Sequence, residues 1–175
     1  MWYLALVMML VTLIVLACCP DVRRQFPVNF IVLVAFTLCE GFLLGAISSN
    51  YEQDAVIIAV GITAVVAASL TLFAFQTKWD FTAWGGMLFV FVIVLFCFGI
   101  LCAIIQNKYA TLAYSALGAL LFSAYLVFDT QLMIGGRHKY SLSPEEYIFA
   151  ALNLYLDIVQ LFMFILTIVG HAQGD

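Results

Sequence analysis

Three carboxylic acids lie inside long apolar stretches of this sequence, where a charged side chain is rarely found. They are Glu40, Asp129 and Asp157. At the centre of a bilayer a carboxylate costs about 2.5–3.5 kcal/mol on insertion scales, so such acids usually pair with one another or mark a path for ions or protons. We take the two aspartates as the main candidates for function and Glu40 as a candidate for an ion path.

Asp129 and Asp157 are predicted to meet. Asp157 lies about 16 Å along its helix from Glu146, and Asp129 lies about 12 Å from the loop that joins the two helices. Helices joined by one loop are expected to be antiparallel neighbours, so the aspartates reach a similar depth. Two carboxylates in close contact cannot easily both ionise, so the pair would share a proton, respond to pH and attract a cation when deprotonated. The plainer alternative is that each aspartate only accepts hydrogen bonds from neighbouring helices.

Other polar residues could support this pair. Asn153 and Gln160 follow the helical spacing of Asp157 and form one polar stripe with it, which must face protein or water. Arg23 and Arg24 stand at the end of the first apolar segment, on the side that Asp129 approaches. A latch between these arginines and the aspartates is therefore one hypothesis.

The composition is that of a membrane protein. Of the 175 residues, 66% are hydrophobic and 9% are charged, against about 45–50% and about 25% in soluble domains. Backbone polar groups in lipid must be paired within the chain, and uninterrupted apolar runs of about 20 residues do this as helices. The sequence therefore predicts an all-α, polytopic membrane helix bundle, with residues 1–175 as a single transmembrane domain. The net charge of −4 and the absence of a basic patch give no indication of nucleic-acid binding.

Six apolar segments are predicted to be transmembrane helices, at about 1–19, 28–49, 55–75, 84–105, 110–134 and 147–170. Ser143 and Glu146 predict a capping box at the start of the last helix. That segment is long enough for a full crossing, although a re-entrant path is the alternative. Five basic residues lie in the first, third and fifth loops, which predicts that these loops face the cytosol and that both termini lie on the opposite side: Arg23, Arg24, Lys78, Arg137 and Lys139.

No signature of soluble catalysis or of a firm metal site is found. The five cysteines lie in or beside apolar runs without zinc-site spacing. A phosphate-binding loop, an HExxH motif and a nucleophile elbow are all absent from the sequence. We therefore expect no tightly bound cofactor.

Several segments resemble a known family. They are CCPDVRRQFPVN, AVGITA, FQTKWDFT, GALLFSAYLVFDTQLMIGG and SPEEYIFAALNLYLDIVQLFMFIL. Together they are similar to the transmembrane Bax inhibitor motif (Bax inhibitor-1-like) family, in its Lifeguard branch, from about Cys18 to Gly170. The resemblance implies a seven-helix bundle with the last helix at its centre. Family members carry an N-terminal tail and one more helix, so this chain, which opens at Met1 in an apolar run, is expected to begin at the second helix of the family.

The resemblance also implies a function and a site. Family members are associated with calcium leak across endomembranes and with suppression of cell death. Their pH-sensitive aspartate pair matches Asp129 in FDTQ and Asp157 in YLDI, which makes Ca²⁺ the expected ion, held weakly and transiently by these two residues. We therefore expect a pH-sensitive, calcium-permeable leak channel of the endoplasmic reticulum or Golgi, with the plasma membrane as an alternative location. Its expected partners are the lipid bilayer, Ca²⁺ and membrane proteins of the cell-death or calcium-release machinery.

Two other functions remain open on the residues alone. A non-conducting regulator of cell death could bind partners through the small-residue face formed by Gly41, Gly45 and Ser49. An intramembrane aspartyl protease would also use two aspartates, one as acid and one as base. However, Asp157 does not follow a Gly-rich turn and no Pro-rich loop is present, so we predict that the protein is not an enzyme.

Overall fold

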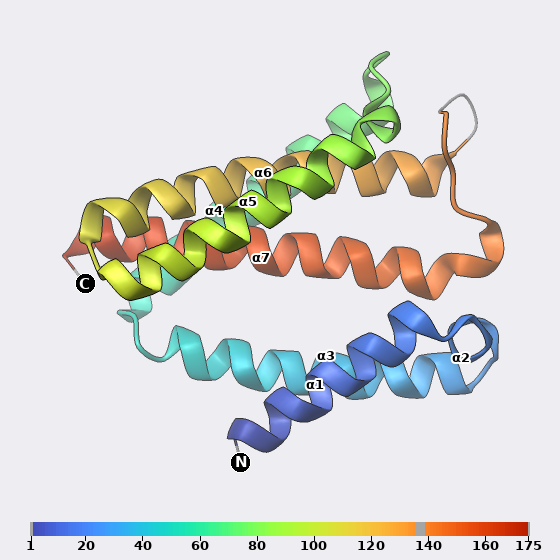
Figure 1. Ribbon diagram of the computed structural model, residues 1–175, viewed down its shortest axis with the longest axis horizontal. Helices are drawn as coiled ribbons and strands as arrows, with labels where there is room; N and C mark the ends of the chain where they lie inside the picture. The colour runs from blue at the N-terminus through green and yellow to red at the C-terminus, as the bar shows by residue number, and fades with distance from the viewer. Residues whose placement is uncertain (1, 136–138, 175) are drawn as a thin grey trace. The chain divides into compact units, whose positions relative to one another are not determined.

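The computed structural model describes residues 2–135 and 139–174, and no strand occurs in this part of the chain. Figure 1 shows its arrangement, which confirms the prediction of an all-α protein. Met1 and Arg137, which entered the predictions above, lie outside the described residues. The α-helices are α1 (Trp2–Cys18), α2 (Pro20–Arg24), α3 (Val28–Ser48), α4 (Gln53–Gln76), α5 (Gly85–Ile105), α6 (Lys108–Ile134) and α7 (Tyr147–Gln173). Two short 3₁₀ helices precede α5 and α7: η1 (Phe81–Trp84) and η2 (Pro144–Glu146).

Five helical segments are long and apolar enough to cross a membrane. They are Val28–Ser48, Gln53–Gln76, Phe81–Ile105, Lys108–Ile134 and Tyr147–Gln173, and α1 is a shorter apolar helix. The chain is thus a multi-pass membrane protein by the length and composition of its helices. The 27 residues of α7 are about 40 Å long, which exceeds a hydrocarbon core of about 30 Å. Because α7 is unbroken, it fits a full crossing better than a re-entrant path.

The distribution of apolar side chains also fits a lipid environment. Val65, Phe96 and Leu120 are each at least 67% exposed, although water would disfavour such exposure. Buried hydroxyl groups are satisfied within their own helices: Thr63 Oγ1 donates to the Ala59 carbonyl at 2.7 Å and Ser115 Oγ to the Thr111 carbonyl at 2.9 Å. The helices therefore present hydrocarbon outward, and these buried hydroxyl groups are paired inside their own helices.

The chain forms two compact units. The first comprises Met1–Tyr51 and Ser143–Asn153, and the second comprises Glu52–Leu142 and Leu154–Asp175. In the first unit α1 packs against α3, and α2 packs against η2. Leu16 and Phe36 are fully buried there.

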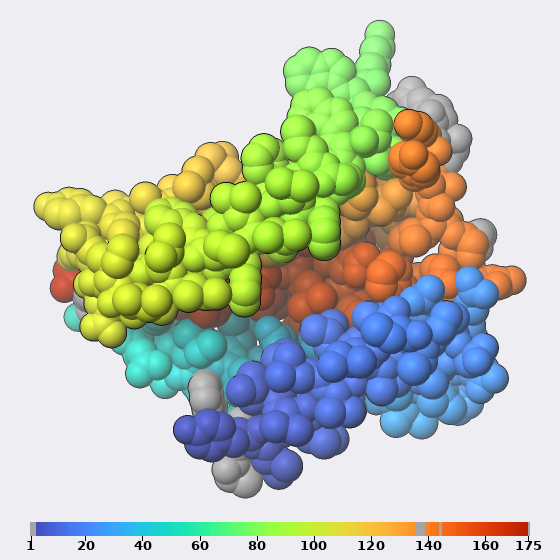
Figure 2. Space-filling view, in the orientation of Figure 1, coloured from blue at the N-terminus to red at the C-terminus, as the bar shows by residue number. Residues whose placement is uncertain are grey.

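In the second unit α6 packs against both α4 and α5, and α5 forms much of the surface on the face drawn in Figure 2. Its core is built from α5, α6 and α7, with four buried residues at the centre: Leu88, Leu95, Leu121 and Phe164. Among the five long helices α7 is the most buried, at 44% of its most apolar stretch against 28% for α6.

The helices lie within about one turn of the predicted ranges, and the differences have local causes. Asn107 caps α6, accepting hydrogen bonds at Oδ1 from the amides of Tyr109 (2.8 Å) and Ala110 (3.3 Å), so the helix begins at Lys108 rather than near residue 110. The α2 and η1 helices occupy segments that were predicted to be loops. Each is too short to show a hydrophobic period.

Candidate functional site

The carboxyl groups of Asp129 on α6 and Asp157 on α7 lie close enough to interact directly within the second unit. Asp129 is 8% exposed and Asp157 is 4% exposed, so both carboxyl groups are shielded from water. A hydrogen bond between two carboxyl groups requires a proton on one of them, because two carboxylates only repel. The structure thus brings the two predicted site residues together in an arrangement that can hold one proton between two acids.

The polar residues around Asp129 point in different directions. Thr130 Oγ1 donates to the carbonyl of Leu126 at 2.6 Å, within α6. Gln131 faces the segment before α5, where its side chain binds the backbone of Trp79 and Phe81. In the FDTQ motif, Thr130 and Gln131 therefore make their hydrogen bonds elsewhere, whereas Asp129 interacts with Asp157.

A residue that the sequence analysis did not identify lies beside the pair. Tyr125, one helical turn before Asp129, is close enough for electrostatic interaction with both Asp129 and Asp157. The spacing of four residues to Asp129 was the available signal, since residues four apart share a helix face. Its ring packs against Phe122 and Phe128, with centroids 5.9 Å and 6.0 Å away. These contacts hold the tyrosine ring against neighbouring aromatic residues of α6.

The pair alone is not a firm metal site. Oδ2 of Asp157 is buried, and no described residue donates a hydrogen bond to it. It is therefore an acceptor that could take a proton or contact a passing cation. A stable Ca²⁺ site uses about 6–8 oxygen ligands, and the described residues contain no cluster of three or more His, Cys, Asp or Glu that could hold a metal ion. The chemistry fits brief contact with a cation rather than storage.

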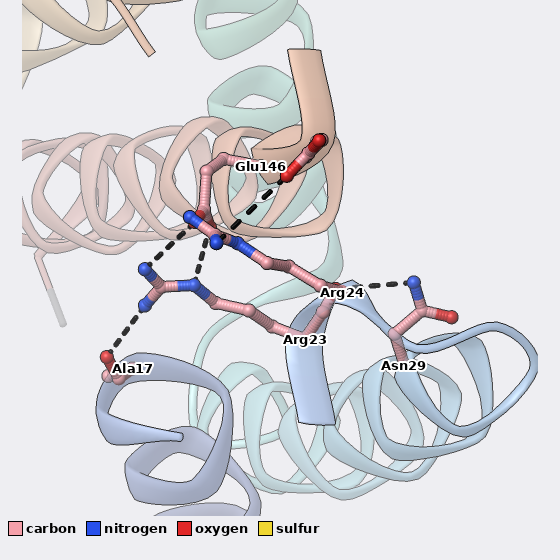
Figure 3. A network of polar contacts seen from close by, with 6 residues as sticks. Ala17, Arg23, Arg24, Asn29 and Glu146 are labelled. Carbon is pink, nitrogen blue, oxygen red and sulfur yellow. Dashed lines mark hydrogen bonds and ion pairs between the residues drawn. The ribbon is translucent and has the colours of Figure 1, made fainter. Parts of the chain in front are cut away.

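Arg23 and Arg24 bind a carboxylate in the first unit. As Figure 3 shows, both guanidinium groups meet the Glu146 side chain at the start of α7. Arg23 Nη2 donates to Glu146 Oε1 at 3.2 Å and Arg24 Nε donates to the same oxygen at 2.7 Å. Arg23 also donates to the carbonyl of Ala17 at 2.9 Å, and its guanidinium lies 4.8 Å from the centre of the Phe149 ring.

These contacts change two predictions. The partner of the arginines is Glu146, in place of the aspartates that the latch hypothesis named. The capping box is also wrong, because the Ser143 side chain makes no capping hydrogen bond and the Glu146 carboxylate is bound to the arginines. The hydrogen bond from Arg23 is the main reason why the pKa of Glu146 is lowered, and Arg24 contributes in the same direction. Glu146 is therefore a carboxylate that stays charged at neutral pH.

Asn29 completes this cluster and was not identified from the sequence. It is fully buried, and its Nδ2 donates to the carbonyl of Arg23 at 3.2 Å and to the Tyr147 hydroxyl at 3.0 Å. Asn29 thus fixes the end of α2 against the first residue of α7. A polar residue in the first turn of an apolar segment was the only signal for it.

The remaining predicted residues lie elsewhere. Asn153 and Gln160 are half-buried on α7, where Asn153 is the last residue of the first unit and Gln160 belongs to the second. Glu40 is half-buried near the middle of α3 in the first unit. The hydroxyl of Thr37, one turn away, donates to the Leu33 carbonyl at 2.9 Å.

Comparison with known proteins identifies the family of this chain. Residues 1–174 match the profile of the family described as inhibitor of apoptosis-promoting Bax1. The chain is 49% identical to protein lifeguard 3 of Mus musculus and 47% identical to protein lifeguard 3 of Homo sapiens, in each case over 98% of its own length. These alignments cover 57% and 56% of the two relatives, so the chain spans little more than half of their length.

A viral protein is also similar. The Golgi anti-apoptotic protein of Vaccinia virus (strain Lister) is 37% identical over 84% of this chain and 60% of its own length. The description of the family and the name of the viral protein both refer to the inhibition of apoptosis.

Proposed function

Because this chain belongs to the Bax inhibitor-1 family, in which its relatives are lifeguard proteins, we propose that it is a membrane regulator that suppresses apoptosis by letting Ca²⁺ leak from an endomembrane store. The observation that carries the proposal is the buried contact between Asp129 and Asp157. The name of the viral relative, a Golgi anti-apoptotic protein, supports both the cell-death role and an endomembrane location. Membrane proteins of the cell-death or calcium-release machinery are its proposed partners.

The proton shared by the aspartates is the proposed gate. With one proton, the pair joins α6 to α7 through a hydrogen bond. Loss of that proton leaves two like charges in contact within a poorly solvated interior, where their repulsion is much stronger than in water. The repulsion drives α6 and α7 apart, and the charged oxygens then attract a divalent cation. Flux should therefore rise with pH.

The test is calcium flux in proteoliposomes that contain the purified full chain, measured over a range of pH. Asp129→Asn and Asp157→Asn each remove one ionisable group of the pair, so we expect flux without a pH response in both variants. Asp54→Asn is the matched control, because Asp54 is an exposed aspartate at the start of α4 in the same unit. A pH response that survives in both pair variants would rule out the gate.

A second candidate is a non-conducting regulator that binds partner helices through α3. Gly41 and Gly45 are exposed, and a Cβ atom added at either glycine meets nothing within 4 Å. This small-residue face is therefore available to another backbone in the membrane. Bulky substitutions, Gly41→Leu and Gly45→Leu, should then abolish cell-death suppression, and the aspartate variants should not affect it. The opposite pattern, with suppression lost in the aspartate variants alone, favours the channel.

A further inference from the structure

Two adjacent cysteines lie where the first apolar helix ends. Cys18 is the last residue of α1, and Cys19 is the N-cap residue of α2. Both thiols are exposed, and neither forms a disulfide among the described residues. The backbone around them is fixed, because the Cys19 amide donates to the Val15 carbonyl at 3.0 Å and the Cys19 carbonyl accepts from the Val22 amide at 3.2 Å. The two side chains therefore stand at a defined corner of the first unit, between α1 and α2.

This corner lies between an apolar helix and a charged segment. The 17 residues of α1 are about 26 Å long, slightly less than a hydrocarbon core of about 30 Å. Arg23 and Arg24 follow at the end of α2, and the distribution of basic residues predicts that this side faces the cytosol. Phe26, just beyond α2, is 76% exposed, and an apolar ring beside charged residues suits the bilayer interface. The two thiols are therefore expected at the cytosolic surface of the membrane.

Polar contacts hold the corner in shape. The guanidinium groups of Arg23 and Arg24 both bind Glu146, and Arg23 also donates to the carbonyl of Ala17, next to Cys18 (Figure 3). The end of α1 is thus joined through Arg23 to the start of α7. Because these contacts use the backbone and the acid, they leave both thiols accessible.

The other three cysteines of the chain are placed differently. Cys102 is buried and Cys39 is half-buried. Cys97 is exposed, but it lies about 18 Å from the first residue of α5 and about 12 Å from the last, which is inside the hydrocarbon region. A water-soluble reagent or cofactor at the membrane surface does not reach that depth. Of the five cysteines, Cys18 and Cys19 are therefore the two that combine exposure with a position at the membrane surface.

We propose that Cys18 and Cys19 form a site of reversible S-acylation by a long-chain fatty acid, a modification separate from the proposed calcium leak. Cysteines next to a membrane segment are typical acceptors of this group. The cysteine sulfur attacks the thioester carbonyl carbon of a long-chain acyl-coenzyme A that a membrane acyltransferase supplies. The bond from that carbon to the coenzyme A sulfur breaks, a new thioester forms on the cysteine, and the thiol proton passes to the departing coenzyme A thiolate.

The attached chain would lie in the bilayer beside α1. It adds hydrocarbon at the end of a helix that is slightly shorter than the membrane core, so it anchors the corner between α1 and α2 at the surface. This corner carries the arginines that bind Glu146. Because a thioester can be hydrolysed again, the anchor is removable.

The test is acyl exchange on the full chain expressed in eukaryotic cells. Free thiols of the denatured protein are blocked with N-ethylmaleimide, thioesters are cleaved with neutral hydroxylamine, and the released thiols are tagged with a polyethylene glycol maleimide that shifts the band on a gel. We expect a shift in the wild type that depends on hydroxylamine, and incorporation of an alkynyl palmitate analogue into the same band. Absence of both signals in the wild type would overturn the proposal.

Substitutions locate the acyl group. The double variant with Cys18→Ala and Cys19→Ala should lose both the shift and the label. Both positions are exposed and alanine favours helix, so the variant should fold, which size-exclusion chromatography in detergent verifies. Cys97→Ala is the matched control and should keep both signals, because its thiol is exposed only inside the hydrocarbon region. Signals that persist in the double variant, or that disappear in the control, would contradict the site.

Mass spectrometry of the wild type provides a measurement that needs no substitution. The tag should be found on the peptide that contains Cys18 and Cys19. A tag found only on peptides with the other cysteines would exclude the proposed site, even if the double variant failed to fold.

Discussion

Gly118 on α6 lies directly against the ring of Phe164 on α7, so closely that a Cβ atom on the glycine would overlap the ring. The ring cannot easily retreat, because Tyr114 and Phe122 hold it at centroid distances of 5.4 Å and 5.8 Å. This contact sets how closely the helices that carry Asp129 and Asp157 approach each other.

Gly118→Ala is therefore expected to destabilise the protein by about 1–3 kcal/mol, the usual range for overpacking a core. The measurement is the free energy of unfolding in mixed micelles. Gly61→Ala is the matched control, because Gly61 lies inside α4 and its added Cβ meets nothing within 4 Å. That variant should be neutral or more stable by up to about 1 kcal/mol, since alanine is the better helix former. Similar losses in the two variants would show that helix flexibility, rather than the Phe164 contact, explains the effect.

Gln131→Leu is expected to release the segment between α4 and α5. The substitution keeps a side chain of similar size but leaves the Trp79 carbonyl and the Phe81 amide without this partner in a partly buried contact. The loss for each group should be at most about 1–3 kcal/mol, which is the cost of a fully buried unsatisfied group. Hydrogen exchange should therefore become faster at the Phe81 amide. Gln76→Leu, at the exposed end of α4, is the control and should leave that amide protected. Unchanged protection in Gln131→Leu would mean that the segment is held by other contacts.

The sequence was most informative where one physical rule acts along one helix. The apolar runs predicted the long helices, because a bilayer requires a set length of continuous hydrocarbon. The depths of Asp129 and Asp157 followed from the helical rise and the single loop that joins their helices, and the structure places their carboxyl groups close together. Family membership was predicted from motif letters alone and is confirmed.

The sequence was less informative about contacts between elements far apart in the chain. Glu146 was assigned to a helix cap because its local spacing fits one, yet two arginines more than 100 positions earlier compete for the same carboxylate. Gln131 is adjacent to a candidate site residue but serves another segment. Hydrophobic periodicity identifies helix faces, but it does not say which polar groups meet when those faces pack.

Glu146→Gln is expected to destabilise the protein and to remove a component of its acid sensitivity. The variant loses charge-assisted hydrogen bonds from Arg23 and Arg24, which amounts to about 1.5–3 kcal/mol. Because these arginines lower the pKa of Glu146 in the folded state, the wild type gains this stability fully above the usual value of 4.5 and loses it as the pH falls through the lowered pKa. The difference between the wild type and the variant should therefore be largest near neutral pH and shrink in acid.

The neighbouring acid provides the control for that substitution. Glu145 has a side chain that is 74% exposed, and its Oε2 is 4.0 Å from Arg24 Nη1. Glu145→Gln should therefore change stability by no more than about 1 kcal/mol. If both variants lost the same stability, the general negative charge at the start of α7, rather than the ion pairs of Glu146, would be responsible.

The contact between Asp129 and Asp157 predicts that substitutions at the two positions are not additive. In a double-mutant cycle with Asp129→Asn and Asp157→Asn, the interaction term should be about 0.5–3 kcal/mol, because each substitution changes a carboxyl group with which the other residue interacts. The pair formed by Asp129→Asn and Asp54→Asn should be additive within about 0.5 kcal/mol, since Asp54 is exposed at the start of α4. Both cycles are measured as free energies of unfolding in micelles, so the result does not depend on whether the protein conducts ions. An additive result for the aspartate pair would mean that the carboxyl groups do not interact in the membrane-embedded protein, and the proton-sharing gate would lose its structural basis.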